Sequence, residues 1–278
     1  MRILIRTSRW AIWARRLGSV AVPLVVISVL LHRLRLITSD IFVNLAVLAA
    51  LVAGLAVLAA IVALARLWQT GDKGWGRALL GLFLGLLCLG PFAWYASLAL
   101  TYPPVTDMAT TSRDGLPLVF EPGTSSMPPP RLLDPAAAAA RFPSAETRTY
   151  PLGQAQTFAL VEQLVADAGW DLRRVRAPDA VFDPALLNAQ IMTLPGFRDE
   201  VVLRVTGDDA SSVVDMRSAS LHATHDFGAN GQRIERFLAD LDTAVTTLLR
   251  DNPNINRPEI EPEPGAGDAP VVEEPAEE

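Results

Sequence analysis

The span from Ile41 to Leu67 constrains this chain most, because it is too long and too apolar for a helix of a soluble core. It is built almost wholly from Leu, Ala, Val and Ile, and Arg66 near its end is its one charged residue. The hydrocarbon layer of a bilayer takes about 20 such residues to cross, and a helix satisfies every backbone polar group there. The span is therefore predicted to be a transmembrane helix.

Two further apolar spans flank it. We expect the first at Leu17 to Leu31 and the third from about Arg77 to Leu100, where Pro91 would kink the helix. The basic N-terminal segment followed by Val20 to Leu31 also resembles a signal peptide. No small-x-small cleavage site follows it, and this favours an uncleaved first span.

The charges are distributed unevenly, which predicts the orientation of the spans. Residues 1–101 carry a net charge of +8, residues 102–250 carry −6, and the tail after Arg250 carries −8. Basic loops stay in the cytoplasm, so we expect a multi-pass inner-membrane protein with a cytoplasmic N-terminus and a periplasmic C-terminal domain. Arg33 and Arg35, in the predicted outer loop, oppose this orientation. The predicted spans make the lipid bilayer an expected partner. Nucleic acid is not an expected partner, because the acidic soluble part would repel its phosphates.

Composition adds three expectations. Lys73 is the only lysine, and the excess of Arg and Ala is typical of a GC-rich bacterial genome. Cys88 is the only cysteine, and we interpret it as a small packing residue. Small residues at four-residue spacing predict close contacts within a three-helix bundle: Ala46, Ala50 and Gly54 in the second span, Gly81 and Gly85 in the third.

The rest of the chain divides into a tether, a domain and a tail. Nine prolines from Pro103 to Pro143 prevent long helices and central strands, so residues 102–145 are predicted to be an extended Pro-rich tether with one helical turn at Asp134–Arg141. Packing along the domain is the alternative, because residues 116–120 are too apolar for a free linker. Residues 251–278 are acidic and rich in Pro, so they are predicted to be disordered.

Residues 146–250 are predicted to form an α+β domain with a mostly antiparallel sheet and two helices. The helices are expected at Gln154–Ala168 and at about Ala229–Leu249, where apolar residues follow helical spacing. Gly207–Asp208–Asp209 is a turn signal that joins two strands as a hairpin. The expected strands are Thr147–Leu152, Asp171–Arg176, Gln190–Leu194, Glu200–Thr206 and Ser212–Arg217.

The densest polar run lies between the last strand and the last helix. Its candidate residues, for a structural or a binding role, are Asp215, Arg217, Ser218, Ser220, His222, His225, Asp226, Asn230 and Arg233. Alternation along a strand places Asp215 and Arg217 on one face, opposite Val214 and Met216. Asp226 lies where its carboxylate can cap the helix that follows.

Two chemical interpretations of this cluster stay open. Ser218 or Ser220 with His222 or His225 and Asp226 would form a hydrolase triad, although the sequence has no Gly-x-Ser-x-Gly turn. The two histidines with Asp226 would bind a metal ion, although a further ligand is not evident.

The interpretation that we favour is structural. In it, Arg217 or Arg233 pairs with Asp215 or Asp226 in a buried hydrogen-bond network that fixes the last helix to the sheet, since unpaired buried charges are costly. We accordingly predict no catalytic residue, no metal and no cofactor.

The same region resembles a known family. The blocks that carry the resemblance are residues 214–220 (VDMRSAS), 226–230 (DFGAN) and 233–234, with an upstream block at 197–204 and an opening at 103–107. They look like the signature of the domain of unknown function 1499 family, over about residues 102–249. Bacterial members often carry short N-terminal membrane spans, in agreement with the spans predicted above. The resemblance implies no established activity.

These observations together predict a non-catalytic inner-membrane protein whose periplasmic domain binds an envelope partner protein or a small ligand. The alternative is a membrane-tethered, hydrolase-like enzyme that uses the polar cluster from Arg217 to Arg233.

Overall fold

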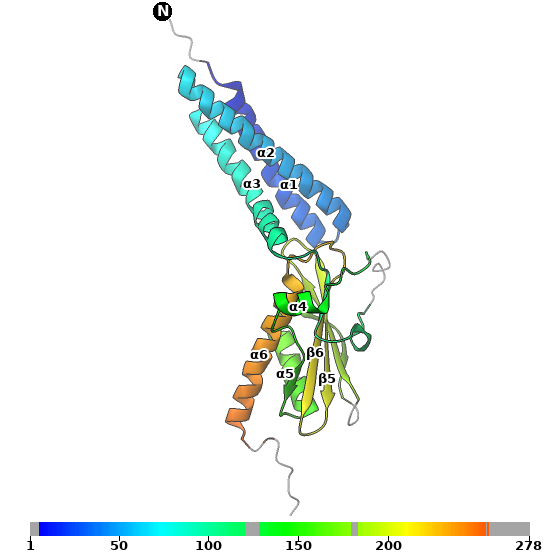
Figure 1. Cartoon of the computed structure of the whole chain (residues 1–278). Coiled ribbons are helices and arrows are strands. Elements are labelled where there is room, and N and C mark those ends of the chain that lie inside the picture. The colour runs from blue at the N-terminus through cyan, green and yellow to red at the C-terminus, as the bar shows by residue number, and fades with distance from the viewer. Residues whose placement is uncertain (1–5, 120–127, 179–182, 254, 256–278) are drawn as a thin grey trace, which may run out of the picture.

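The computed structural model describes residues 6–119, 128–178, 183–253 and 255, and it has two parts joined end to end (Figure 1). The first part is a bundle of three helices: α1 (Arg9–Arg33), α2 (Ser39–Thr70) and α3 (Trp75–Thr101). The second part is a sheet domain with helices packed on it.

Each helix of the bundle is long and apolar enough to cross a membrane, which confirms the three predicted spans. The first span was expected at Leu17–Leu31, but α1 begins at Arg9. The extra turns form because Ala11 and Ala14 are completely buried against α2 and α3. Packing therefore extends this helix beyond its most apolar stretch.

Small residues hold the bundle together, but in α2 they are not the expected ones. A Cβ built at Gly54 would meet no atom within 4 Å, and Ala46 and Ala50 are only partly buried, so the predicted stripe of Ala46, Ala50 and Gly54 is not the buried face of α2. The residues of α2 that are buried are Ala49, Ala53, Ala56, Ala59, Ala60 and Ala63. Gly81 and Gly85 of α3 do pack as predicted, against the backbones of α1 and α2.

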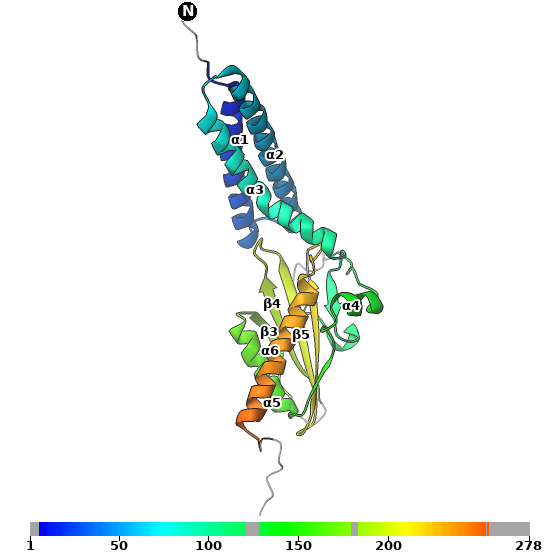
Figure 2. The ribbon, with the colours of Figure 1, turned by 60° about the vertical axis from the view of Figure 1, so that its left-hand side comes forward.

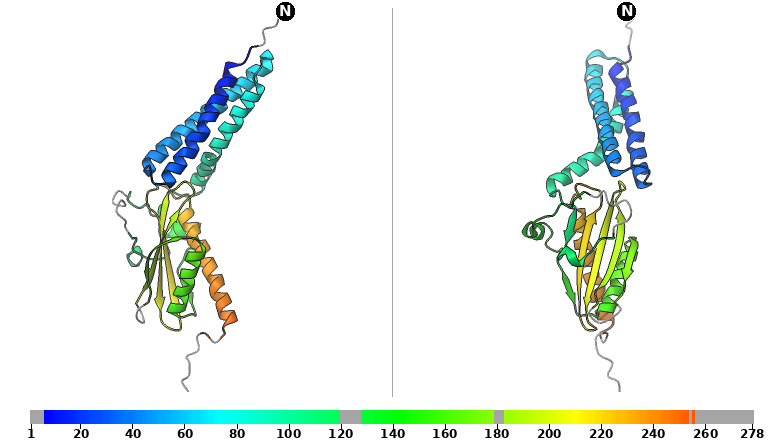
Figure 3. Two further views of the ribbon diagram at one scale, coloured as in Figure 1. Left: turned by 180° about the vertical axis from the view of Figure 1, so that it is seen from behind. Right: turned by 90° about the vertical axis from the view of Figure 1, so that its right-hand side faces the viewer.

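α3 leaves the bundle in its last part. Its buried residues, Ala78, Gly81, Gly85 and Cys88, all precede Pro91, which lacks the N–H that would bond a carbonyl one turn earlier. Figure 3 shows the end of α3 turned away from α1 and α2 and towards the sheet domain. The bend lets α3 feed the chain directly into that domain.

The sheet has six strands, and every pair in it is antiparallel. Its order is β1-β6-β5-β4-β3, and β2 pairs with β6 beside β1. This arrangement confirms the α+β class. The strands are β1 (Asp107–Ala109), β2 (Arg148–Tyr150), β3 (Asp171–Arg176), β4 (Ala185–Met192), β5 (Arg198–Gly207) and β6 (Ser212–Ser220).

The strand bounds agree with the prediction to different extents. β3 has the expected bounds, whereas β4 begins at Ala185 rather than at Gln190. Ala185, Leu187 and Ala189 are completely buried, but two of these three side chains are small and give a weak signal of alternation. Pairing with β5 from Ala185 onwards therefore extends this strand.

Two helices, α5 (Gln154–Asp167) and α6 (Ala229–Asp251), cover one face of the sheet (Figure 2). Their apolar residues form the main core with alternate residues of β4, β5 and β6, among them Leu187, Leu203 and Met216. This helix-covered face carries most of the buried apolar surface of the domain.

Residues 102–119 and 128–145, within the segment expected to be a tether, pack along the domain. β1 pairs with β6, and Leu116 and Leu118 cover the opposite face of the sheet, where they contact Val202 and Leu221. A short helix, α4 (Pro135–Arg141), lies where one turn was predicted, with Asp134 accepting hydrogen bonds from its first amides. The tail predicted to be disordered lies outside the described residues from 256 onwards.

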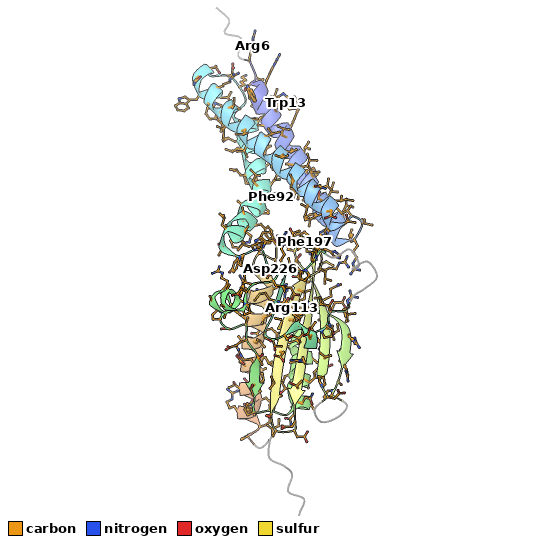
Figure 4. All side chains as sticks on the ribbon, turned by 45° about the vertical axis from the view of Figure 1, so that its right-hand side comes forward. Arg6, Trp13, Phe92, Arg113, Phe197 and Asp226 are labelled. Carbon is orange, nitrogen blue, oxygen red and sulfur yellow. The ribbon has the colours of Figure 1, made fainter. Side chains whose placement is uncertain are left out.

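The bundle and the sheet domain meet in a joint at the end of α1. His32 stacks on Phe42 of α2 and contacts the edge of Phe197 in the β4–β5 turn, with ring centroids 4.5 and 4.9 Å apart. His32 Nδ1 lies 2.8 Å from the carbonyl oxygen of Pro195. On the side of α3, Tyr95 contacts Phe227. Figure 4 shows Phe197 and Asp226 at the end of the domain that faces the helices.

Candidate functional site

The sheet separates the predicted polar cluster into two networks. Successive residues of β6 point to opposite faces, so Ser218 and Ser220 lie beneath α6 while Asp215 and Arg217 lie on the other face. Their hydrogen-bond partners come from different elements. The candidate residues therefore do not form one site.

The network beneath α6 centres on Arg233. Its Nη2 donates to Oδ2 of Asp199 at 2.6 Å, and its Nη1 donates to Ser218 Oγ at 2.7 Å and to Asn230 Oδ1 at 2.9 Å. Asn230 is completely buried and donates in turn to Ser220 Oγ and to the backbone oxygen of Thr106. The network thus ties the start of α6 to β5, to β6 and to the segment before β1.

Asp226 caps α6, as predicted. Its carboxylate accepts the backbone N–H groups of Gly228 at 2.9 Å and of Asn230 at 3.2 Å. Burial raises the pKa of Asp226 above its usual value, and the nearby charge of Asp199 adds to this rise, although the two backbone hydrogen bonds oppose it. This carboxyl group is therefore harder to ionise in the folded domain than in the unfolded chain.

A pH dependence follows from the raised pKa of Asp226. The stability that the protonated form contributes is present below the usual value of 3.8 and is lost as the pH rises through the folded-state pKa. Asn at this position does not titrate, so the unfolding free energy of Asp226→Asn minus that of the wild type should rise with pH across this window. Hydrogen exchange of the α6 and β6 amides at a series of pH values measures the difference.

Asp208 provides the control for this experiment. Backbone hydrogen bonds from Ala210 and Ser211 lower its pKa, so its contribution to stability is lost as the pH falls through the folded-state pKa. The corresponding difference for Asp208→Asn should change with pH in the opposite sense. A difference for Asp226→Asn that does not vary with pH would contradict the prediction.

The second network lies on the opposite face and centres on Asp107, whose side chain is buried. Arg217 donates to both carboxylate oxygens of Asp107, at 3.1 and 2.7 Å, and to the backbone oxygen of Leu116 at 2.8 Å. Arg113 also lies 3.3 Å from Asp107. These contacts hold the segment after β1 against the sheet.

Two further buried carboxylates on this face have partners as well. Asp215 accepts hydrogen bonds from Arg204 Nη2 at 2.7 Å and from Thr147 Oγ1 at 2.6 Å. Glu200 accepts from the side chain of Asn188 at 2.9 Å and from the backbone N–H of Val119 at 2.6 Å. The three buried carboxylates on this face of the sheet therefore each accept hydrogen bonds beneath the covering segment.

The expectation of a buried network agrees with these contacts, but the expected pairs were wrong. Arg217 binds Asp107 rather than Asp215, and Arg233 binds Asp199 rather than Asp226. Sequence reasoning had not placed Asp107 or Asp199 among the candidates, although both lie in the blocks of the family resemblance. The family blocks therefore already contained the two carboxylates that bind the arginines.

The histidines lie apart from the buried serines. His225 accepts the backbone N–H of Phe227 at Nδ1 and stacks on the Phe227 ring, while the hydroxyl of Ser218 is bonded to Asn230 and Arg233. Burial lowers the pKa of His222, and the charge of Arg198 lowers it further. Among the described contacts, neither histidine bonds Ser218 or Ser220, so the serine triad is not assembled.

The described residues contain no group of three or more His, Cys, Asp or Glu side chains that could hold a metal ion. His225 Nδ1 lies 4.0 Å from Asp226 Oδ1, and Asp226 already caps α6. The arrangement does not gather the three residues of the metal interpretation around one point.

A groove between α5 and α6 was not expected from the sequence. It consists of two shallow hollows of about 320 and 340 Å³ that share Leu164. The hollow nearer the joint is lined by Trp170 and Phe237, with Arg233, Arg236 and Asp240 beside them. The other is lined by Leu160, Thr247 and Leu248. A run of half-buried apolar side chains with charged neighbours therefore follows the two helices.

Comparison with known proteins identifies the domain that carries these features. No match to this chain is found among the curated proteins or among the solved structures. Residues 124–241 match the model of one family, described as Protein of unknown function (DUF1499), which confirms the resemblance over this part of the chain.

Proposed function

We propose that this chain is a non-catalytic inner-membrane protein whose periplasmic domain binds an envelope partner protein through the groove between α5 and α6. The observation that carries the proposal is the contrast between the two sites. Apart from its two histidines, the polar cluster is bonded within the buried structural networks, whereas the groove leaves Leu160, Leu164 and Trp170 only partly covered. A shallow surface of mixed polarity is typical of a protein–protein interface, whereas small molecules bind in more enclosed cavities.

The distribution of basic residues supports the orientation. Cytoplasmic loops are enriched in Arg and Lys, and the end of the bundle remote from the sheet domain carries Arg6, Arg9, Arg15, Arg16, Arg66, Lys73 and Arg77. Arg33 and Arg35, which opposed this orientation in the sequence, both donate hydrogen bonds to the sheet domain. Their presence beside that domain therefore has a local structural reason.

The joint supports a fixed presentation of the groove. The domain is held on one side by His32 and on the other by Tyr102, the residue that follows α3, whose hydroxyl accepts a hydrogen bond from Gln232 at 2.6 Å. α6 starts at the joint and runs away from the bundle (Figure 1). The groove would thus face the periplasm at a fixed distance from the bilayer. A fixed distance favours a partner that is itself anchored in the envelope.

The enzyme alternative receives no comparable support. A hydrolase needs an accessible nucleophile beside a base, and the Ser218 side chain is completely buried.

Cysteine labelling tests both parts of the proposal, because Cys88 is the only native cysteine and is buried. Thr247 lies exposed in the groove, and Arg174 lies exposed on β3, outside it. In the purified chain, Thr247→Cys and Arg174→Cys should react at similar rates with a membrane-impermeant maleimide. In intact cells with a permeabilised outer membrane, Arg174→Cys should still react, and Thr247→Cys should react several-fold more slowly because the partner covers it.

The two arms can fail separately. Labelling of Arg174→Cys only after lysis would place the domain in the cytoplasm. Equal rates for both cysteines in cells would show that nothing covers the groove.

A further inference from the structure

The end of α1 carries two arginines whose bonding differs from that of three partly buried arginines in the sheet domain. Arg33 Nη1 donates to the backbone oxygens of Thr193 at 3.0 Å and Leu194 at 2.9 Å. Arg35 Nη2 donates to the side-chain oxygen of Gln190 at 3.4 Å. All three acceptors are neutral.

Three partly buried arginines of the sheet domain bind carboxylates instead. Arg204, Arg217 and Arg233 each place a guanidinium nitrogen 2.6 or 2.7 Å from an aspartate oxygen. Within the residues that the structure describes, neither Arg33 nor Arg35 has a carboxylate oxygen within 4.0 Å. Two positive charges are therefore held in place by neutral acceptors, with no carboxylate of the described residues paired to them.

The surroundings place these charges at the level of lipid headgroups. They lie where α1 ends, just before α2 begins, and both helices are long and apolar enough to cross a bilayer. Leu34 and Leu36, which alternate with the two arginines, are 66% and 67% exposed. Apolar side chains that are this exposed are stable when lipid covers them.

Guanidinium groups at this depth meet the phosphates of lipids before any other abundant anion. A guanidinium is planar, stays charged and binds phosphate oxygens with two parallel N–H bonds. Arg33 uses only Nη1 in the bonds described above, so its Nη2 and Nε donors can face the bilayer. The neutral acceptors fix the two side chains, which lowers the entropy cost of binding a headgroup.

We propose that Arg33 and Arg35 form a binding site for the phosphate of an anionic lipid, at the joint between the bundle and the sheet domain. The bound headgroup would bridge the α1–α2 loop and the β4–β5 turn, and would supply the negative charge that no described carboxylate places within 4.0 Å of these two arginines. The proposal requires only that the bundle lies in a bilayer. It depends neither on the side of the membrane that the domain occupies nor on the partner proposed above.

Lipid retention by the full chain tests the site. The chain is reconstituted in nanodiscs with equal amounts of phosphatidylcholine and phosphatidylglycerol. Native mass spectrometry then counts the lipids that stay bound after the protein is released from the nanodisc. Each arginine near an anionic surface contributes about 1 kcal/mol to binding, and every 1.4 kcal/mol is tenfold, so the double variant R33Q/R35Q should retain phosphatidylglycerol about thirtyfold less well than the wild type. Arg250→Gln, at the end of α6 remote from the bundle, should retain it unchanged.

Two further measurements keep the outcome decisive. If R33Q/R35Q does not fold, R33K/R35K replaces it; this variant keeps the charge but loses the paired N–H geometry, so retention should fall several-fold. Excess inorganic phosphate should not displace the lipid. Unchanged retention of phosphatidylglycerol in R33Q/R35Q or in R33K/R35K, or displacement by inorganic phosphate, would overturn the proposal.

Discussion

Replacing Arg233 with alanine is expected to lower the free energy of unfolding of the sheet domain by about 3–5 kcal/mol, the cost of breaking a buried ion pair by removing one partner. The change leaves Asp199, which is 2% exposed, without its guanidinium partner. It also removes a donor to both Ser218 and Asn230. The charge of Asp226 lies close by and adds repulsion.

Hydrogen exchange of the β5 and β6 amides, measured on the full chain in nanodiscs, gives this free energy. Arg236→Ala is the matched control, since Arg236 lies one turn further along α6, is not buried and bonds only the backbone of its own helix among the described contacts; its effect should stay within about 0.5 kcal/mol. Arg217→Ala should fall between the two, because Arg113 remains beside Asp107. Equal values for Arg233→Ala and Arg236→Ala would show that the buried pair does not stabilise the domain.

A second large effect is expected in the bundle, where Gly81→Ala should destabilise the helix packing by about 1–3 kcal/mol. A Cβ at Gly81 would lie 2.4 Å from the backbone carbon of Ala14 and 2.6 Å from its oxygen. Backbone atoms cannot rotate aside as a side chain does, so α1 and α3 must separate along their contact.

Gly90→Ala is the matched control in the same helix, because a Cβ at Gly90 would meet no atom within 4 Å. Unfolding of both variants by SDS titration in mixed micelles, followed by circular dichroism, compares them under identical conditions. Gly81→Ala should unfold at a clearly lower SDS fraction than the wild type, and Gly90→Ala should not. The same midpoint for both variants would contradict the close approach of α1 and α3.

These two predictions rest on contacts that differ in how far they could be foreseen. The use of Gly81 as a close contact follows from its spacing to Gly85, because a helix places residues four apart on one face. In α2 the same reasoning selected Gly54, whereas the buried face includes Ala49 and Ala53. Alanine is abundant all round this helix, so its sequence leaves the rotation about the helix axis undetermined, and contacts with α1 and α3 set it.

The sequence alone determined the features that depend on neighbours along the chain. Hydropathy and length determined the three helices, and alternation and helical spacing determined most strands and both long helices. The blocks around β5, β6 and α6 indicated the family whose model matches residues 124–241. The ion pairs needed the tertiary structure, because Arg217 and its partner Asp107 are 110 residues apart. The register between β1 and β6 brings them together, and local pattern does not encode that register. The groove and the joint were likewise decided only by folding, since each is formed by surfaces of elements that meet through the packing of the whole domain.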